Sequence, residues 1–330
     1  MEHLNMLEEV TREILRDPVD YRRLHRAIQG FDGLMAATSS LDLDAEENRD
    51  NLHFTSGKAL GTTWAAMCLR EIQRTRQFVR GLHRAVRECR QRHSRPVHLL
   101  YVGTGPYATL LLPLTTQFRP EELRVTLMEV NPRTIDSLNR VVERLDLAPY
   151  VVEIIQDNAV THTLRAPRQY DIFLSETMQQ ALVKEQQVPI MLNLLPQLRP
   201  DTIIIPETMR LTLVSDRWEK SGQPHTLAPL LDFNADYVSA FRRLPAASRE
   251  REEFLLLDHH PLSALNLEAP DALQVATEIQ TYGPNWIRHQ ECSLTLPWPL
   301  VPVQRIPPNA THLTLKYHWR DVPGYRVLFT

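Results

Sequence analysis

Apolar residues recur with helical spacing over the N-terminal part of the chain. Residues 4–15 place their leucine, isoleucine and valine side chains on one face, which is typical of an amphipathic helix. The pattern pauses at Asp17-Pro18, resumes to Gly30, and returns over about residues 62–91 after an acidic segment, 41–50, that we expect to be a surface loop. We therefore predict a helical cap over residues 1–93. The candidate buried residues of the last helix are Trp64, Met67, Leu69, Ile72, Phe78, Leu82 and Val86.

The middle of the chain alternates short apolar runs with amphipathic segments. Asn131-Pro132 is suited to open one of the helices, with Asn as the cap and Pro in the first turn. Strands that alternate with helices predict an α/β fold with a Rossmann-like, doubly wound and mostly parallel sheet, which we assign to residues 94–206. The predicted strands are 97–102, 124–129, 151–155, 170–175 and 201–206.

The pattern changes after residue 206. Proline becomes frequent, and short apolar runs are separated by turn residues, which favours antiparallel strands. We therefore predict a β-rich C-terminal domain over residues 207–330 that contributes to a substrate site. Its candidate strands are 209–214, 253–257, 273–280, 291–296, 311–318 and 325–329.

A glycine-rich turn follows the first predicted strand of the middle region. It reads Gly103-Thr104-Gly105-Pro106-Tyr107-Ala108 and precedes an apolar segment compatible with a helix. Gly103 can adopt backbone angles closed to other residues, Gly105 lets the main chain approach a ligand, and Ala108 permits tight packing. The next strand ends in Glu129, where a carboxylate can accept both hydroxyls of a ribose. This combination predicts a nucleotide-containing cofactor.

Two cofactors use this arrangement, a dinucleotide and S-adenosylmethionine. Pro106 and Tyr107 make the turn bulkier than a dinucleotide turn, and the third strand ends in polar residues suited to an adenine edge. Residues 97–206 resemble the core of class I S-adenosylmethionine-dependent methyltransferases, with the turn as their first motif. The resemblance implies that Glu129 binds ribose and Asp157 contacts adenine, although Glu129 as a solvated strand end and Asp157 as a helix cap stay open as alternatives. The candidate cofactor-binding residues are Tyr101, Gly103, Thr104, Gly105, Glu129, Asn131, Asp157, Asn158 and Ser175.

One departure from that family concerns Tyr101. The family commonly carries an acidic residue two positions before the first glycine, and this chain has a tyrosine there. We therefore expect a changed environment at the methionine end of the cofactor.

The fourth predicted strand ends in Ser175-Glu176, and Glu185 follows Glu176 by nine residues. This spacing resembles protein arginine methyltransferases, in which two glutamates hold the substrate guanidinium. The resemblance implies that Glu176 and Glu185 are catalytic, because paired carboxylates bind forked donors. Thr177 and Gln179 stand where that family has an aromatic residue and a glycine, so another amine-bearing substrate is open. Glu185 on an exposed helix face is the alternative interpretation.

These features predict methyl transfer from S-adenosylmethionine to a nitrogen of a small amine, an amino acid or a peptide, with an arginine-like substrate included. Two alternatives remain open. The first is an aminocarboxypropyl transferase or azetidine-forming cyclase that releases methylthioadenosine. The second is a non-catalytic adaptor on a methyltransferase fold.

The composition of the chain bears on its binding partners and its cell compartment. The 330-residue chain has a formal net charge of −3, which gives no basic footprint for nucleic acid; the arginines between residues 70 and 95 fit a solvated helix face. Three scattered cysteines indicate a reducing compartment, and no apolar run reaches membrane-spanning length. We expect a cytoplasmic protein, without a metal, that can form a homodimer. We expect His312 and His318 to pack in the core, although either could approach the active site.

Overall fold

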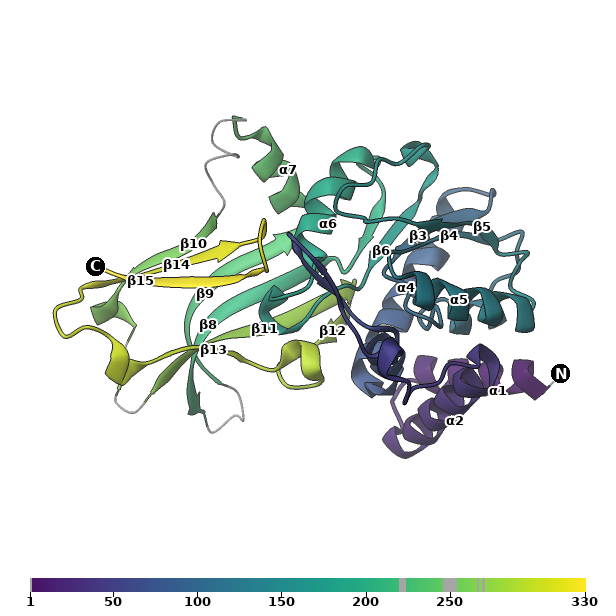
Figure 1. Ribbon diagram of the computed structural model, residues 1–330, viewed down its shortest axis with the longest axis horizontal. Helices are drawn as coiled ribbons and strands as arrows, with labels where there is room; N and C mark the ends of the chain where they lie inside the picture. The colour runs from purple at the N-terminus through teal and green to yellow at the C-terminus, as the bar shows by residue number, and fades with distance from the viewer. Residues whose placement is uncertain (1, 220–223, 246–253, 266, 269–270) are drawn as a thin grey trace.

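The N-terminal region of the computed structural model is helical and lies against one face of a parallel sheet (Figure 1). The structure describes residues 2–219, 224–245, 254–265, 267–268 and 271–330. The cap contains helices α1 (Glu2–Leu15), α2 (Tyr21–Ser39), α3 (Thr62–Met67) and α4 (Ile72–Arg92), and a short hairpin of β1 (Leu52–Phe54) and β2 (Gly57–Ala59).

The central sheet has five parallel strands in the order β5-β4-β3-β6-β7. All of them therefore end at the same edge, which is where ligands bind in open α/β sheets. The expected Rossmann-like fold is confirmed. The strands are β3 (Val97–Val102), β4 (Leu123–Glu129), β5 (Val151–Gln156), β6 (Ile172–Ser175) and β7 (Ile203–Ile205). Along the chain, helix α5 (Pro132–Arg144) connects β4 to β5, and helix α6 (Gln187–Leu194) connects β6 to β7.

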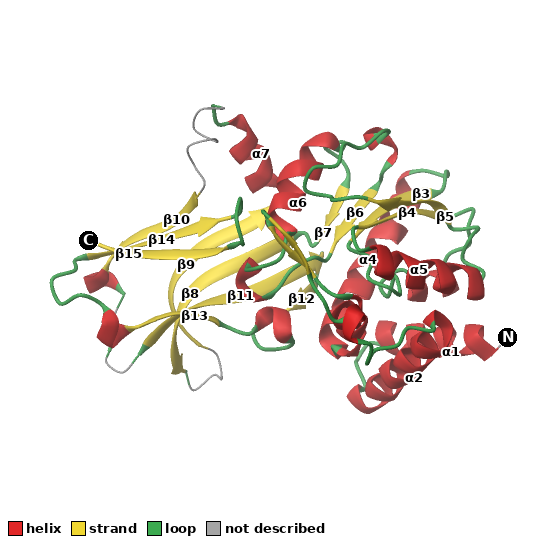
Figure 2. Cartoon of the chain, in the orientation of Figure 1, coloured by secondary structure: helices red, strands yellow, loops and turns green. Residues whose placement is uncertain are grey.

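The C-terminal region is built from two antiparallel sheets (Figure 2). The larger contains β8 (Thr208–Trp218), β9 (Pro224–Asn234), β11 (Ala272–Tyr282), β12 (Asn285–Ile287) and β13 (Trp298–Pro302). The smaller contains β10 (Phe254–Pro261), β14 (His312–His318) and β15 (Gly324–Phe329), and α7 (Ala235–Arg243) follows β9. Gly81 brings α4 close to β11, because a Cβ atom there would lie 2.6 Å from the Thr281 hydroxyl.

Three elements of the structure differ from those predicted from the sequence. The long helix over 62–91 is interrupted, because residues 68–70 form a 3-10 turn and Glu71 is extended (φ −79°, ψ 92°). The run 291–296 is not a strand, because Ser293–Thr295 form a 3-10 turn. Cys292, just before this turn, donates its N–H to the Thr295 hydroxyl. The segment after the glycine turn is not an α-helix but a series of turns ending in a 3-10 helix, Leu112–Thr116. Ala108 is left-handed (φ 46°) and Pro113 lacks an N–H, so a regular helix cannot form.

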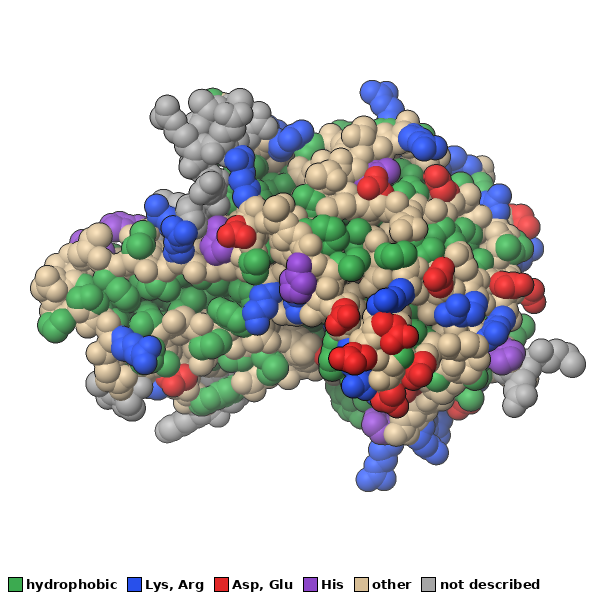
Figure 3. Space-filling view, in the orientation of Figure 1, with side chains coloured by type: hydrophobic (Ala, Val, Ile, Leu, Met, Phe, Trp, Pro, Cys, Tyr) green, Lys and Arg blue, Asp and Glu red, His purple; other side chains and the backbone are tan. Residues whose placement is uncertain are grey.

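The acidic segment 41–50 lies at the surface, as expected. Acidic side chains gather over it in Figure 3, beside the β1–β2 hairpin. It is held against the cap, because Trp64 Nε1 donates to the Arg49 carbonyl (3.0 Å). Within the described part of the chain, every helix is too short or too polar to cross a bilayer.

Candidate functional site

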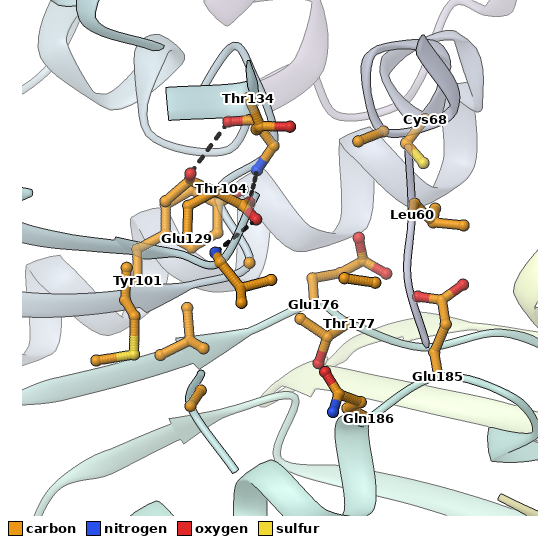
Figure 4. A pocket seen from close by; sticks show the side chains of 18 of the residues that line it. Leu60, Cys68, Tyr101, Thr104, Glu129, Thr134, Glu176, Thr177, Glu185 and Gln186 are labelled. Atoms are coloured by element: carbon orange, nitrogen blue, oxygen red, sulfur yellow. Dashed lines mark hydrogen bonds between the residues drawn. The ribbon is translucent and has the colours of Figure 1, made fainter. Parts of the chain in front are cut away.

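A cavity opens at the carboxyl ends of β3, β4, β5 and β6, beneath the hairpin and α3 (Figure 4). It holds about 950 Å³ of space free of protein atoms, its open mouth included. Nine of the predicted site residues line it: Tyr101, Gly103, Thr104, Gly105, Glu129, Asp157, Asn158, Glu176 and Glu185. Asn131 and Ser175, also predicted, lie behind its wall.

Glu129 is fixed by the backbone around it. Its Oε2 accepts from Gly105 N (3.1 Å), and its Oε1 accepts from Val130 N (2.8 Å) and Asn131 N (3.1 Å). Burial raises the pKa of Glu129, and these three N–H donors act against that rise. Asn131 caps α5 by accepting from Arg133 N. Glu129 is therefore a buried carboxylate held at the cavity wall rather than a solvated strand end.

The glycine turn needs its glycines. Gly103 and Gly105 have φ of +74° and +60°, which L side chains rarely adopt. A Cβ atom on Gly103 would lie 2.2 Å from Thr177 Cγ2, so the turn is also packed against the end of β6. Tyr101 is buried, and this burial raises the pKa of its phenol far above the ordinary value. A neutral hydroxyl thus stands where the resembled family has an acid.

The end of β5 contributes a second polar wall. Asp157 Oδ2 lies 2.6 Å from His162 Nδ1, and this hydrogen bond lowers the pKa of Asp157. The Oδ1 atom of Asp157 accepts from Asn158 N (2.7 Å), so part of the hydrogen-bonding capacity of this carboxylate is used within the loop. Ser175 points away from the cavity, with its Oγ 3.1 Å from Gln187 Oε1.

Glu176 is paired with a residue that the sequence analysis did not single out. Arg74 Nη2 of α4 donates to Glu176 Oε2, and both side chains are about nine-tenths buried. The expectation that the arginines of this helix are solvated is therefore wrong for Arg74, and it is also wrong for Arg76, which is equally buried. A signal was present: Arg74 lies one helical turn before Phe78, in register with the buried stripe, where a cation needs a partner.

Glu185 lies in a loop and forms a parallel bridge with Lys58 of β2, not on an exposed helix face. Burial first, and then the neighbouring Glu176, raise the pKa of Glu185 to about 7. Glu176 and Glu185 point into the same space, below Leu60 and Cys68 (Figure 4). The Oε1 atoms of both glutamates are buried without a hydrogen-bond partner among the residues that the structure describes, and the Gln179 side chain beside Glu185 acts against the rise of its pKa. Two carboxylate oxygens in one cavity are thus left for a donor.

A second cavity of about 960 Å³, its mouth again included, adjoins the first. The two share Leu60, Cys68, Arg74 and Glu185, so these side chains form the wall between them. Its outer part is lined by Trp64, Met67, Met178, Gln179 and Ser293, among others. It reaches Glu185 and Arg74 from the surface and includes no residue of the glycine turn. Burial raises the pKa of the Cys68 thiol to about 11, so the thiol stays protonated there near neutral pH.

The C-terminal histidines stand elsewhere. The His312 ring stacks on that of His259 (centroids 4.8 Å apart), and His318 is half-buried at the end of β14; neither lines either cavity. The described residues contain no group of three or more histidine, cysteine or acidic side chains that could hold a metal ion.

No protein-family model and no curated protein matches the sequence. Solved structures match its fold. The chain is similar to the crystal structure of PRMT6, with a TM-score of 0.52 and 12% identity over 79% of this chain and 97% of that one. A structure of PRMT6 with SAH (S-adenosylhomocysteine) gives a TM-score of 0.50 and 12% identity over 80% of this chain and 98% of that one. Protein arginine methyltransferase 10 of Arabidopsis thaliana gives a TM-score of 0.46 and 13% identity over 76% of this chain and 94% of that one. The chain therefore has the class I methyltransferase fold in the form that PRMT6 has, with a β-rich region after the Rossmann-like core.

Proposed function

We propose that this protein is an S-adenosylmethionine-dependent methyltransferase that acts on a nitrogen of a cationic acceptor. The observation that carries the proposal is the pair of orphaned carboxylate oxygens, Glu176 Oε1 and Glu185 Oε1, in the cavity that also contains the glycine turn and Glu129. The shared fold with PRMT6, whose structure with SAH is known, supports the choice of cofactor.

The cavity's residues fit this cofactor. Glu129 would hold the ribose, because a carboxylate can accept more bonds than its backbone donors use. Asp157 and Asn158 would face the adenine, whose ring would lie among apolar residues such as Met128 and Ala159. Gly105 lines the cavity with bare main chain, and a side chain there would take space from the ligand. When bound, the cofactor supplies an electrophilic methyl group on a sulfonium.

The acceptor side of the cavity favours a cation. Arg74 pairs with Glu176 and Lys58 faces Glu185, but neither cation donates to the two buried Oε1 atoms, which are left as acceptors for a ligand. A guanidinium or ammonium that enters by the second cavity would donate to these oxygens, with its aliphatic stem against Met67 and Met178. The acidic loop 41–50 borders that entrance through Trp64 and would attract cations.

The chain's own groups would then orient and deprotonate the acceptor. A nitrogen must have a free lone pair to attack a methyl group, so an ammonium first loses a proton. Glu185, with a pKa of about 7, is suited to hold that proton near neutral pH. Glu176 would fix the orientation of the nitrogen, and Arg74 would fix Glu176.

The test compares Glu176→Gln and Glu185→Gln with Glu13→Gln, a matched control. Glu13 is likewise buried and paired with an arginine, Arg16 (2.6 Å), but lies in α1, outside both cavities. Each protein is incubated with S-adenosylmethionine and a panel of peptides and amines, and the products are identified by mass spectrometry. We expect S-adenosylhomocysteine (SAH) from the unmodified protein and the control. Loss of a charge-assisted hydrogen bond, about 1.5–3 kcal/mol, should slow both site variants by roughly 10- to 150-fold.

The same experiment separates the other outcomes. Methylthioadenosine in place of SAH would mean aminocarboxypropyl transfer or ring closure. Full activity in both glutamine variants would place the acceptor site elsewhere. An absence of turnover with every acceptor, together with intact cofactor binding, would favour an adaptor.

A further inference from the structure

The loop that carries Glu185 has an unusual backbone. Ala181, Leu182 and Lys184 have φ of 53°, 59° and 67°, in the left-handed region that favours glycine. None of the three is a glycine or an asparagine. Such a conformation persists only where the surrounding structure holds it, so the groups that hold this loop determine where Glu185 lies.

Two tyrosines of the C-terminal region hold it on one side. Tyr317 Oη donates to the Leu182 carbonyl (2.6 Å), and Tyr325 Oη donates to the Ala181 carbonyl (2.7 Å). Thr277 Oγ1 of β11 accepts from Ala181 N (3.0 Å). Three polar groups of the loop are thus satisfied by side chains from three strands that lie more than 90 residues away in sequence.

The tyrosines act as a preformed pair. Tyr317 of β14 and Tyr325 of β15 are direct cross-strand partners. Their rings meet edge to face, with centroids 5.4 Å apart at 69°. Burial raises the pKa of both phenols, so both keep the proton that they donate. The pairing of the strands therefore presents two donors side by side to two successive carbonyls.

The other side of the loop is tied to the turn before β15 and to the hairpin. Lys184 N donates to the Pro323 carbonyl (2.7 Å), and Lys58 N donates to the Lys184 carbonyl (2.9 Å). Gly57 leaves no space here, since a Cβ atom on it would lie 2.7 Å from the Lys184 carbonyl oxygen.

We propose that Tyr317 and Tyr325 are positioning residues that hold the second glutamate in the cavity, which makes the C-terminal region part of the acceptor site. The catalytic meaning of this role rests on the proposed function, whereas the position of Glu185 does not. Nothing in the pair touches the first cavity, so the two hydroxyls act only through the loop.

The experiment uses the full chain with Tyr317→Phe, Tyr325→Phe and both together. Tyr150→Phe is the matched control: its hydroxyl shares its proton between two backbone carbonyls, of Thr115 (3.0 Å) and Phe118 (2.8 Å), and none of these residues belongs to the loop or to the strands that hold it. Two readouts are taken without cofactor or acceptor. One is amide hydrogen exchange over residues 181–185, and the other is the titration of the Glu185 carboxyl, assigned by its loss in Glu185→Gln.

We expect exchange over residues 181–185 to speed by roughly 5- to 30-fold in the double variant, from the loss of one or two hydrogen bonds. The Glu185 midpoint should fall from about 7 toward the 4.5 of a free carboxyl as water reaches it. The other charged groups that face it, Glu176, Arg74 and Lys58, stay in place. Tyr150→Phe should change neither readout.

Exchange and titration equal to those of the unmodified protein would overturn the proposal, and so would the same change in Tyr150→Phe. If the double variant does not fold, the two single variants carry the same test. Because neither readout needs turnover, a failure to detect methyl transfer would count against the proposed function and leave this inference standing.

Discussion

Arg74 and Glu176 set the charge of the cavity. Taking a lone charge out of water is expensive, and pairing within the protein offsets that penalty. The pair leaves Glu185 as the group whose ionisation changes with pH, because burial and Glu176 both oppose its charge. The chemistry of the site therefore depends on three side chains from three different segments.

Removing the cation should destabilise the protein. Arg74→Met leaves Glu176 buried and without its partner, and breaking such a pair from one side costs about 3–5 kcal/mol. Arg74→Met/Glu176→Gln should recover part of this loss, because no unpaired charge is left. Urea unfolding of the single and double variants measures the coupling, and additive losses would show that the pair contributes nothing to the folded state.

Glu185 should make stability fall as pH rises. An unfolded glutamate titrates near 4.5 and the folded one near 7, so between these values the folded state holds a proton that the unfolded state has lost. The free energy of unfolding contributed by this group is retained below about 4.5 and lost by about 7. Glu185→Gln should remove this slope and be more stable above pH 7, by about 3 kcal/mol at most. Thermal unfolding from pH 5 to 8 checks it; an unchanged slope would mean that Glu185 is not buried in solution.

At the scale of elements, the β1–β2 hairpin covers the cavity. Lys58, Ala59 and Leu60 line it, and Gln186 Nε2 donates to Ser56 Oγ (2.7 Å) at the hairpin tip. A ligand that fills the space beneath should hold the hairpin closed. We predict slower amide exchange over residues 50–70 when SAH is bound, with exchange in α7, which packs on β9 and on residues 195–197, unchanged as the internal control. Equal exchange at confirmed saturation would refute the role of a lid.

The acidic loop, residues 41–50, should attract a cationic acceptor through its charge alone, without contacting it. Asp42, Asp44, Glu46 and Glu47 are exposed, and neutralising all four to amides removes a field without removing a wall of either cavity. We expect the KM for a cationic acceptor to rise at low salt and the difference to vanish at about 1 M salt, where charges are screened beyond about 3 Å. A salt-independent effect would indicate a direct contact instead.

Strands and helices with strong periodicity were predictable, and irregular ones were not. The five parallel strands were found within two residues at each end, because buried runs bounded by turn residues have few other solutions. β9 was missed because it contains Pro224 and Pro229, and it tolerates them as the edge strand of its sheet. The hairpin was missed because its strands are three residues long and depend on packing against the Glu185 loop.

The candidate site shows the same limit. The glycine turn, Glu129 and the two glutamates came from local motifs, and the structure brings them to one cavity. The burial of Arg74 had a local signal, but its pairing with Glu176 was missed because the two lie 102 residues apart; the tyrosine pair was missed because the carbonyls that it binds belong to a distant loop. Contacts of this kind follow from tertiary packing, which a single sequence does not display.

At the scale of the whole molecule, the core and the C-terminal region are joined at the site. Thr281 Oγ1 of β11 donates to the Gln77 carbonyl of α4 (2.8 Å), on the helix that carries Arg74. The tyrosine pair reaches the loop that carries Glu185. The helix that carries Arg74 and the loop that carries Glu185 are thus both hydrogen-bonded to the C-terminal region, and we interpret this region as a structural part of the site.

The central claim is that the cavity binds S-adenosylmethionine or its product, and calorimetric titration with SAH tests it most directly. We predict saturable binding of one SAH per chain, weakened by roughly 1–3 kcal/mol in Glu129→Ala, which loses its hydrogen bonds to the ribose, and unchanged in Glu13→Gln. NADH should produce no binding heat. Binding of NADH with no binding of SAH would contradict the account.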